Sequence, residues 1–212
     1  MLIRHIGHAE FLIETEEGYR LVTDPYDASC GYPVQAVSAD AVLVSHQHHD
    51  HNAVENVAGD KRVIDAAGSY TLEKDVKVTA FRGYHDEFQG TKRGETLLFL
   101  IETEGLRVVH LGDLGDDLSE EAARGLAKPD ILMIPVGGFF TIDAKKASRI
   151  AEKLEARIIL PMHYKTEYNA EWPISGPEAF LSLYGSDEIG RGGEALRVTR
   201  GDLMCHPRVV LL

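Results

Sequence analysis

Residues 45–52 read SHQHHDHN and hold four histidines and one aspartate, directly after the apolar run AVLV. Imidazole and carboxylate groups are common ligands of divalent cations. His46 and His48 are two positions apart, and side chains at this spacing point the same way where a strand enters a loop, so both could bind one metal. The tighter turn through Asp50 and His51 could offer two ligands to a second metal, and His49 is expected to face away.

A second interpretation of this segment is a histidine-rich loop that binds metals without a function. Such a loop normally lies at a terminus or in polar low-complexity sequence. This one follows an apolar run at 41–44 that is typical of a buried strand. Its position therefore favours a metal site.

The spacing H-x-H-x-D-H, filled by His46, His48, Asp50 and His51, resembles the signature of the metallo-β-lactamase superfamily. The resemblance implies two neighbouring divalent cations and three more ligands downstream in a set order. The matching residues are His85 in FRGYHDE as the third ligand of the first metal, Asp113 in VVHLGDLG as the bridging carboxylate, and His163 in ILPMHYKT as the last ligand of the second metal. A histidine at a strand end is more often structural, but seven donors in the implied order favour a site.

His110 competes with His85 for the third position because it lies three residues before Asp113. Residues 108–112 are predicted to form a strand that leads to the Asp113 turn, and residues at opposite ends of that turn are not expected to reach the same metals. His85 is therefore preferred. His110 is expected to hydrogen-bond a ligand or to contact the substrate.

The resemblance also implies a hydrolase in which the metals activate a hydroxide, while Asp50 orients the water or accepts its proton. Five imidazoles and two carboxylates without a thiolate favour zinc, and manganese or iron also suit such a site. The expected substrate is a small ester, lactone or phosphodiester. The alternatives are a metal-binding or sensor module without turnover and a nucleic-acid-processing phosphodiesterase.

Within the superfamily, the segments GHAEFLIET, DPY, GDLG, GGFFTIDAKKA and PMHYKT resemble small metal-dependent hydrolases that include ascorbate-6-phosphate lactonases and, more distantly, lipid-cleaving phosphodiesterases. This resemblance covers most of residues 1–170. Further candidates for positioning or substrate contact are His8, Asp24, Tyr84, Tyr164 and Lys165, and the resemblance implies that the segments of the first two run beside the metals. Turn formation or packing is the alternative for each of them. Gly137 and Gly138 could let the backbone approach the site, with Phe139 and Phe140 as a pocket wall or as a core or subunit contact.

A repeated segment predicts how the fold positions these residues. FLIETE occurs at 11–16 and again at 99–104. Each copy reads as a β-hairpin around Gly18 or Gly105, with a second strand that ends in Asp24 or Asp113. A buried strand, 41–45 or 130–136, and a helical stretch are expected after each hairpin. The sequence therefore predicts two similar halves and an αββα sandwich of two mixed sheets with helices outside.

Helices are predicted over 52–59, 119–127 and 143–156, the last with Thr141 and Asp143 as capping residues and a strand RIILP after it. Beyond Pro173 the pattern indicates a short helix and a closing hairpin.

Composition limits the classes of function. The 212 residues are 44% hydrophobic and 26% charged, which is typical of one globular domain spanning 1–212. The net charge of −12 argues against nucleic acid as a partner. The chain shows no apolar stretch long enough for a membrane and no leader pattern, so a cytoplasmic protein with a small-molecule substrate is expected. Cys30 and Cys205 lack a zinc or disulfide pattern, and homo-oligomer formation stays open.

Overall fold

The first half of the chain forms a mixed sheet around its predicted hairpin. The computed structural model describes residues 1–191 and 193–212. This sheet has the order β15-β1-β2-β3-β5-β7. Its strands are β1 (Leu2–Gly7), β2 (Glu10–Glu14), β3 (Arg20–Thr23), β5 (Ala41–Leu43), β7 (Arg62–Ile64) and β15 (Leu196–Arg197).

The second half forms a larger sheet with the order β14-β16-β13-β12-β11-β10-β9-β8. Its strands are β8 (Gly68–Thr71), β9 (Lys77–Tyr84), β10 (Glu95–Thr103), β11 (Leu106–His110), β12 (Ile131–Pro135), β13 (Ile158–Met162), β14 (Ile189–Arg191) and β16 (Val209–Leu211). A third pair, β4 (Val37–Ser38) and β6 (Val57–Ala58), lies outside both sheets.

The two halves repeat one topology. In the first, β1, β2 and β3 pair antiparallel, and β5 and β7 are added parallel. In the second, β9, β10 and β11 pair antiparallel, and β12 and β13 are added parallel. The FLIETE copies begin in the middle strands, β2 and β10. The turn residues Gly18 and Gly105 have positive φ values of 76° and 71°, which glycine adopts without strain. The predicted hairpins and similar halves are confirmed.

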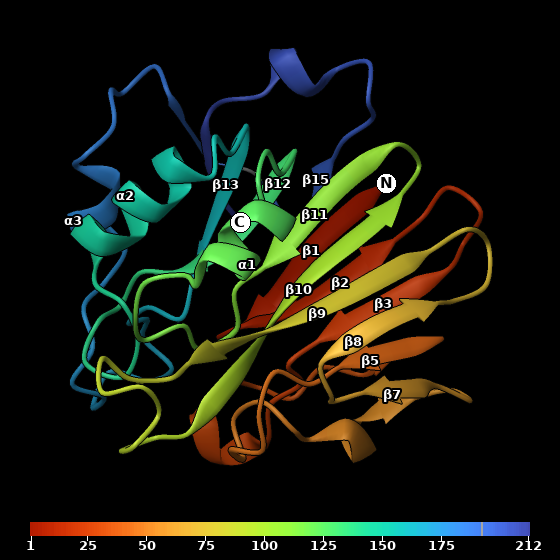
Figure 1. Cartoon of the computed structure of the whole chain (residues 1–212), viewed down its shortest axis with the longest axis horizontal. Coiled ribbons are helices and arrows are strands. Elements are labelled where there is room, and N and C mark those ends of the chain that lie inside the picture. The colour runs from red at the N-terminus through yellow and green to blue at the C-terminus, as the bar shows by residue number, and fades with distance from the viewer. Residues whose placement is uncertain (192) are drawn as a thin grey trace.

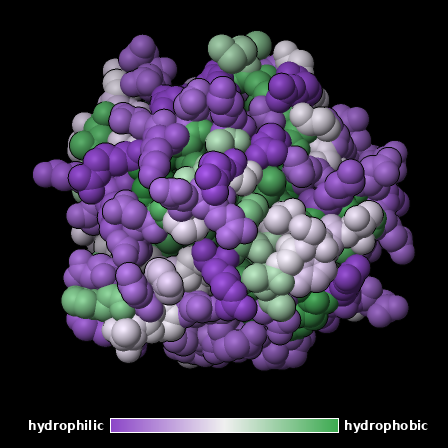
Figure 2. Space-filling model, viewed as in Figure 1, coloured by the Kyte–Doolittle hydropathy of each residue, from purple (hydrophilic) through white to green (hydrophobic). Residues whose placement is uncertain are grey.

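The sheets pack face to face, as their overlap in Figure 1 also shows. One buried cluster joins Phe11, Ile13 and Leu43 of the first sheet to Phe99 and Met133 of the second. Strands with one buried face alternate apolar and polar residues, and strands with two buried faces are apolar throughout. The predicted α/β sandwich of two mixed sheets is confirmed, with its α-helices outside the second sheet in the described residues, and hydrophilic side chains dominate the face seen in Figure 2.

Helices cover the outer face of the second sheet and gather on one side in Figure 1. They are α1 (Glu120–Gly125), α2 (Ala144–Lys153) and α3 (Glu178–Leu181). Asp143 caps α2, because its carboxylate accepts a hydrogen bond from the Lys146 backbone N–H at 2.8 Å. The capping role predicted for Thr141 is wrong, since its hydroxyl donates to the Ile142 carbonyl.

The helix predicted over 52–59 is also wrong. This stretch forms a 3-10 turn at Val54–Asn56 and then strand β6. Asn and Val are weak helix formers, and the stretch is too short for a helix to persist without tertiary contacts. Val57 instead pairs with Val37 of β4. The outer face of the first sheet is thus covered by loops and 3-10 turns.

The closing hairpin predicted after Pro173 is not found in the residues described there, 174–191 and 193–212. β14 and β16 are parallel neighbours, and β15 pairs with β1 of the other sheet. Edge pairing with strands far away in sequence has replaced the local pairing. In the described residues, no helix has both the length and the apolar character needed to cross a membrane.

Candidate metal centre

The predicted donors lie at one edge of the sandwich because they follow the carboxyl ends of strands. In each sheet these strands are parallel to one another, so the segments after them emerge at the same edge. The segment after β5 carries His46, His48, Asp50 and His51, and His85, Asp113 and His163 follow β9, β11 and β13. The fold therefore brings together donors from residue 46 to residue 163.

Asp113 lies at the centre of the group. Its Oδ2 atom is 3.2 Å from His163 Nε2, 3.3 Å from both His51 Nε2 and His85 Nε2, and 3.9 Å from His46 Nε2. One carboxylate oxygen thus approaches four imidazoles that come from both halves of the chain.

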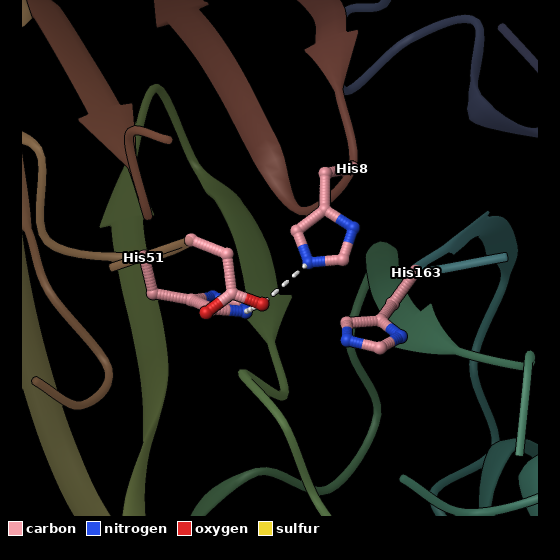
Figure 3. A group of neighbouring side chains, drawn as sticks. His8, His51 and His163 are labelled. Carbon is pink, nitrogen blue, oxygen red and sulfur yellow. Dashed lines mark ion pairs between the residues drawn. The ribbon is translucent and has the colours of Figure 1, made fainter. Parts of the chain in front are cut away.

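The donors form two groups. The ligand atoms of His46, His48 and His85 all lie within 4.8 Å of one another. A second group with the same spread contains Asp50, His51, His163 and also His8. Figure 3 shows His8, His51 and His163 of this group with their rings gathered around one point. His46, His51 and Asp113 connect the two groups.

Several buried donor atoms fit a bound cation. Within the described chain, Asp113 Oδ1, His51 Nε2 and both ring nitrogens of His8 make no hydrogen bond of good geometry. Buried polar groups are normally paired, because an unpaired one costs about 1–3 kcal/mol. Imidazole nitrogens and carboxylate oxygens are suitable ligands for zinc. The donor set therefore fits divalent metal ions.

Charge in the site is consistent with this fit. Burial alone would raise the pKa of Asp113, but the His163 and His51 imidazoles hold it well below its usual range. Burial would likewise raise the pKa of Asp50, and His51 and His8 lower it instead. Burial lowers the pKa of His46 to about 3. Burial would also lower the pKa of His51, but the carboxylates of Asp113 and Asp24 raise it well above its usual value. A cation bound at His51 would therefore displace a proton from this ring, because metals bind ionised carboxylates and deprotonated imidazole nitrogens.

Asp24 orients His51 from behind. Its carboxylate accepts hydrogen bonds from the Ser45 backbone N–H at 2.6 Å and from the Ser45 hydroxyl at 2.7 Å, and it lies 3.1 Å from His51 Nδ1. Asp24 is fully buried and has a φ of 41°. A carboxylate behind a metal-binding histidine fixes the ring and increases its basicity. The structure thus places Asp24 in a positioning role and not in a simple turn.

His110 lies away from the donor groups. Its Nδ1 accepts the Gly112 backbone N–H at 3.1 Å, and its Nε2 is therefore the nitrogen that donates to the Ala9 carbonyl at 3.0 Å. It is fully buried, and Asp24 Oδ2 is 3.9 Å from its Nδ1. Its hydrogen bonds thus go to backbone groups and not to a metal-binding side chain, and its full burial does not fit a substrate contact.

A cavity of about 410 Å³ opens over the donors. Besides donors of both groups, it is lined by His49, Arg93, Phe140, Glu171, Trp172 and Pro173. His49 is exposed and lies outside the two donor groups, with a ring nitrogen within 4.8 Å of ligand atoms of Asp27 and Cys30. The sequence analysis did not identify Arg93, Glu171 and Trp172, because they belong to no recognisable motif. The one available signal was that Trp172 is the single tryptophan of the chain.

The other candidates differ in position. Gly137 lets two backbones approach, because a Cβ there would lie 2.3 Å from the His163 carbonyl oxygen. Phe140 borders the cavity, whereas Phe139 is 62% exposed. Tyr164 packs in the core under the helices, and burial raises its pKa to about 12. Tyr84 and Lys165 do not border this cavity. Packing or solvent contact therefore fits Tyr84, Tyr164 and Lys165 better than a contact with the substrate.

Comparisons with known proteins agree with this geometry. A family model described as the beta-lactamase superfamily domain matches residues 2–163. A UPF0173 metal-dependent hydrolase of Methanosphaera stadtmanae is 28% identical over 198 residues, covering 78% of this chain and 85% of the relative. One of Thermococcus onnurineus is 29% identical over 213 residues, covering 86% and 92%.

A crystal structure from Thermotoga maritima, described as a Zn-dependent hydrolase of the metallo-beta-lactamase superfamily, is also similar. It is 36% identical to this chain, with a TM-score of 0.78 and coverage of 99% of this chain and 97% of that one.

Proposed function

The chain belongs to the metallo-β-lactamase superfamily of metal-dependent hydrolases, and we propose that it holds two divalent cations and hydrolyses a small ester, lactone or phosphodiester. His46, His48 and His85 would hold the first cation, and Asp50, His51 and His163 the second. The observation that carries the proposal is the position of Asp113 Oδ2, within 3.9 Å of four imidazoles from both groups.

Two cations bound there would supply a hydroxide at neutral pH and polarise the oxygen of the bond to be cleaved. Side chains of the protein would position the metals and the water. Asp113 holds the two groups together, and Asp24 and Ser45 fix the ring of His51. Asp50 is buried and borders the cavity, so its carboxylate can orient the attacking water or accept its proton.

The cavity supports a small substrate. Its volume of about 410 Å³ lies in the range of small-molecule pockets, and Phe140 and Trp172 offer apolar walls. The net charge of −12 disfavours a polyanionic partner such as nucleic acid. Zinc is the preferred metal because imidazoles outnumber carboxylates among the donors.

A metal-reconstitution assay tests the proposal. Metal-free protein is titrated with zinc or manganese and assayed with bis-p-nitrophenyl phosphate and with a simple lactone. We expect two metals per chain and turnover of at least one substrate, abolished by Asp113→Asn or His48→Ala. His206→Ala, a histidine away from the site, serves as the control. Two bound metals without turnover on either substrate would favour the non-catalytic module instead.

A further inference from the structure

His8 lies in the second donor group although it has no place in the H-x-H-x-D-H pattern. It is the residue directly after β1 and is 1% exposed. Its Nε2 is 3.3 Å from Asp50 Oδ2. The centre of its ring is 4.2 Å from that of His163 and 5.1 Å from that of His51. Figure 3 shows the His8 ring pointing to the space that His51 and His163 also face.

We propose that His8 is a direct ligand of the second metal. The inference rests on the proposed binuclear site and adds a residue to it. The second metal would then have three imidazoles, from His8, His51 and His163, in addition to its carboxylates. The first metal also has three, so the two sites would match in imidazole number.

The hydrogen-bond pattern of His8 supports a ligand role. Both of its ring nitrogens are buried, and within the described residues neither makes a hydrogen bond of good geometry. The one carboxylate near Nε2 is that of Asp50, at 3.3 Å, which belongs to the same donor group. A structural histidine such as His110 instead uses both nitrogens, one for the Gly112 N–H and one for the Ala9 carbonyl. A buried imidazole that meets only other ligand atoms is explained by a cation between them.

The backbone holds His8 in this place against strain. Its φ of 54° lies in the left-handed region, which is less favourable than the right-handed region for a residue with a Cβ. The carbonyl oxygen of His8 accepts the backbone N–H of His163 at 3.0 Å and also lies 3.0 Å from His5 Nε2. His163 has a similar φ of 50°. The backbones of two donors are therefore tied together.

The repeat of the fold gives a second, independent argument. His8 directly follows β1 and His85 directly follows β9, the first strands of the two antiparallel units β1-β2-β3 and β9-β10-β11. His85 lies in the first donor group and His8 in the second. Equivalent positions of the two halves thus supply one imidazole to each group.

Zinc-edge anomalous scattering from crystals of the zinc-loaded wild-type protein tests the proposal directly. A His8 nitrogen at about 2.0–2.1 Å from the second zinc is expected. A separation above about 3 Å, with Asp50 or a water between them, would overturn it. A single bound zinc would overturn it too. This measurement does not depend on turnover, so its outcome is separate from that of the hydrolase assay.

A variant adds a readout that a merely positioning residue would not change. His8→Gly removes the imidazole, and glycine accepts the left-handed φ without strain. Loss of an imidazole donor should lower the affinity of the second site for zinc by at least about 100-fold. It should also shift the preference of that site from zinc toward manganese. The first site should change by less than about threefold.

His206→Ala is the matched control, because this histidine lies outside both donor groups. If His8→Gly lowers the zinc affinity and the manganese affinity of the second site equally, His8 positions Asp50 and is not a ligand. If both affinities stay unchanged, His8 has no role in metal binding. Either result overturns the ligand role and leaves the proposed hydrolase untouched.

Discussion

At the scale of residues, the metal centre depends on side chains behind the donors as much as on the donors. Asp24 precedes a proline and reads as a turn residue, yet it is fully buried and contacts both Ser45 and His51. Arg93 matches no motif, yet it lines the cavity. Their roles follow from their neighbours, and each leads to a prediction.

Replacement of Asp24 by asparagine should lower the affinity of the second site for its metal. The variant keeps the shape of the side chain but removes the charge that holds His51 Nδ1 at 3.1 Å. Partners of this kind contribute about 10–100-fold to metal affinity. Zinc titration of the metal-free protein measures the change. Asp202→Asn is the control, because Asp202 lies outside every donor group and accepts from the Thr199 backbone N–H near the C-terminal end of the chain. An unchanged affinity in Asp24→Asn would contradict the positioning role.

Replacement of Arg93 by alanine should affect anionic substrates selectively. Its guanidinium lies 5.5 Å from the centre of the Phe140 ring, and within the described residues no carboxylate lies within 4.0 Å of it. It is thus available to a negative group of a substrate. We expect KM to rise by about tenfold, or about 1.4 kcal/mol, for an anionic lactone and little for a neutral one of equal size.

Lys92→Ala is the control for Arg93, since Lys92 is exposed and lies over the Phe88 ring instead of the cavity. Equal changes in KM for the anionic and the neutral lactone would exclude charge recognition by Arg93.

At the scale of elements, strand ends and short connections carry the site, and the helices stabilise it from outside. Helix α2 is anchored to the segment after β11 by Lys146, whose Nζ donates to Asp116 Oδ1 at 2.8 Å. Asp116 lies three residues after the central Asp113. The pair therefore connects the outer helix to the segment that holds the bridging carboxylate.

The Asp116–Lys146 pair should make stability depend on pH. The Lys146 hydrogen bond lowers the pKa of Asp116, so the pair is fully present above the ordinary aspartate pKa of about 3.9 and is lost as pH falls through the lower folded value. At pH 7, Asp116→Asn should lower the unfolding free energy by up to about 1 kcal/mol, because a partly exposed pair is screened by solvent.

Urea unfolding of the metal-free proteins at pH 7 and at about pH 3 measures this effect, and the difference from wild type should shrink at the lower pH. Asp117→Asn is the control, because Asp117 is 3.7 Å from the same Nζ and its side chain is 75% exposed. A difference that stays constant with pH would contradict the assignment.

At the scale of the whole molecule, the site joins the two sheets. His8 and the segment 46–51 come from the first sheet, whereas His85, Asp113 and His163 come from the second. Cations bound between them would cross-link the halves and offset part of the net charge of −12. Metal binding is therefore expected to stabilise the entire sandwich.

Removal of the metals should lower Tm. Zinc at about a hundred times Kd stabilises a folded protein by about 2.7 kcal/mol per site. For a chain of this size, one kcal/mol corresponds to about 2–4 °C. Calorimetry before and after EDTA treatment should show a drop of roughly 10–20 °C that zinc reverses. EDTA should lower the Tm of His48→Ala by less than that of the wild type, because this variant has lost a ligand of the first metal. An unchanged Tm would argue against metals that bridge the sheets.

The sequence by itself determined the donor types, their order and the local elements that carry them. Each hairpin is encoded by alternating residues around Gly18 or Gly105, and α2 by its apolar face and the Asp143 cap. The ligand order came from the resemblance of the H-x-H-x-D-H segment and the three downstream donors. These features depend on contacts between residues that are close in sequence, or on a motif that those residues carry.

Only the tertiary structure decided which distant segments meet. His8, Arg93 and Trp172 lie in different parts of the chain, and strand order and backbone conformation bring them to the same centre. The same cause explains the errors at 52–59 and after Pro173, where β6 and β15 pair with strands remote in sequence. Local patterns cannot encode such pairings, because their free energy comes from surfaces that exist only after the sheets have packed.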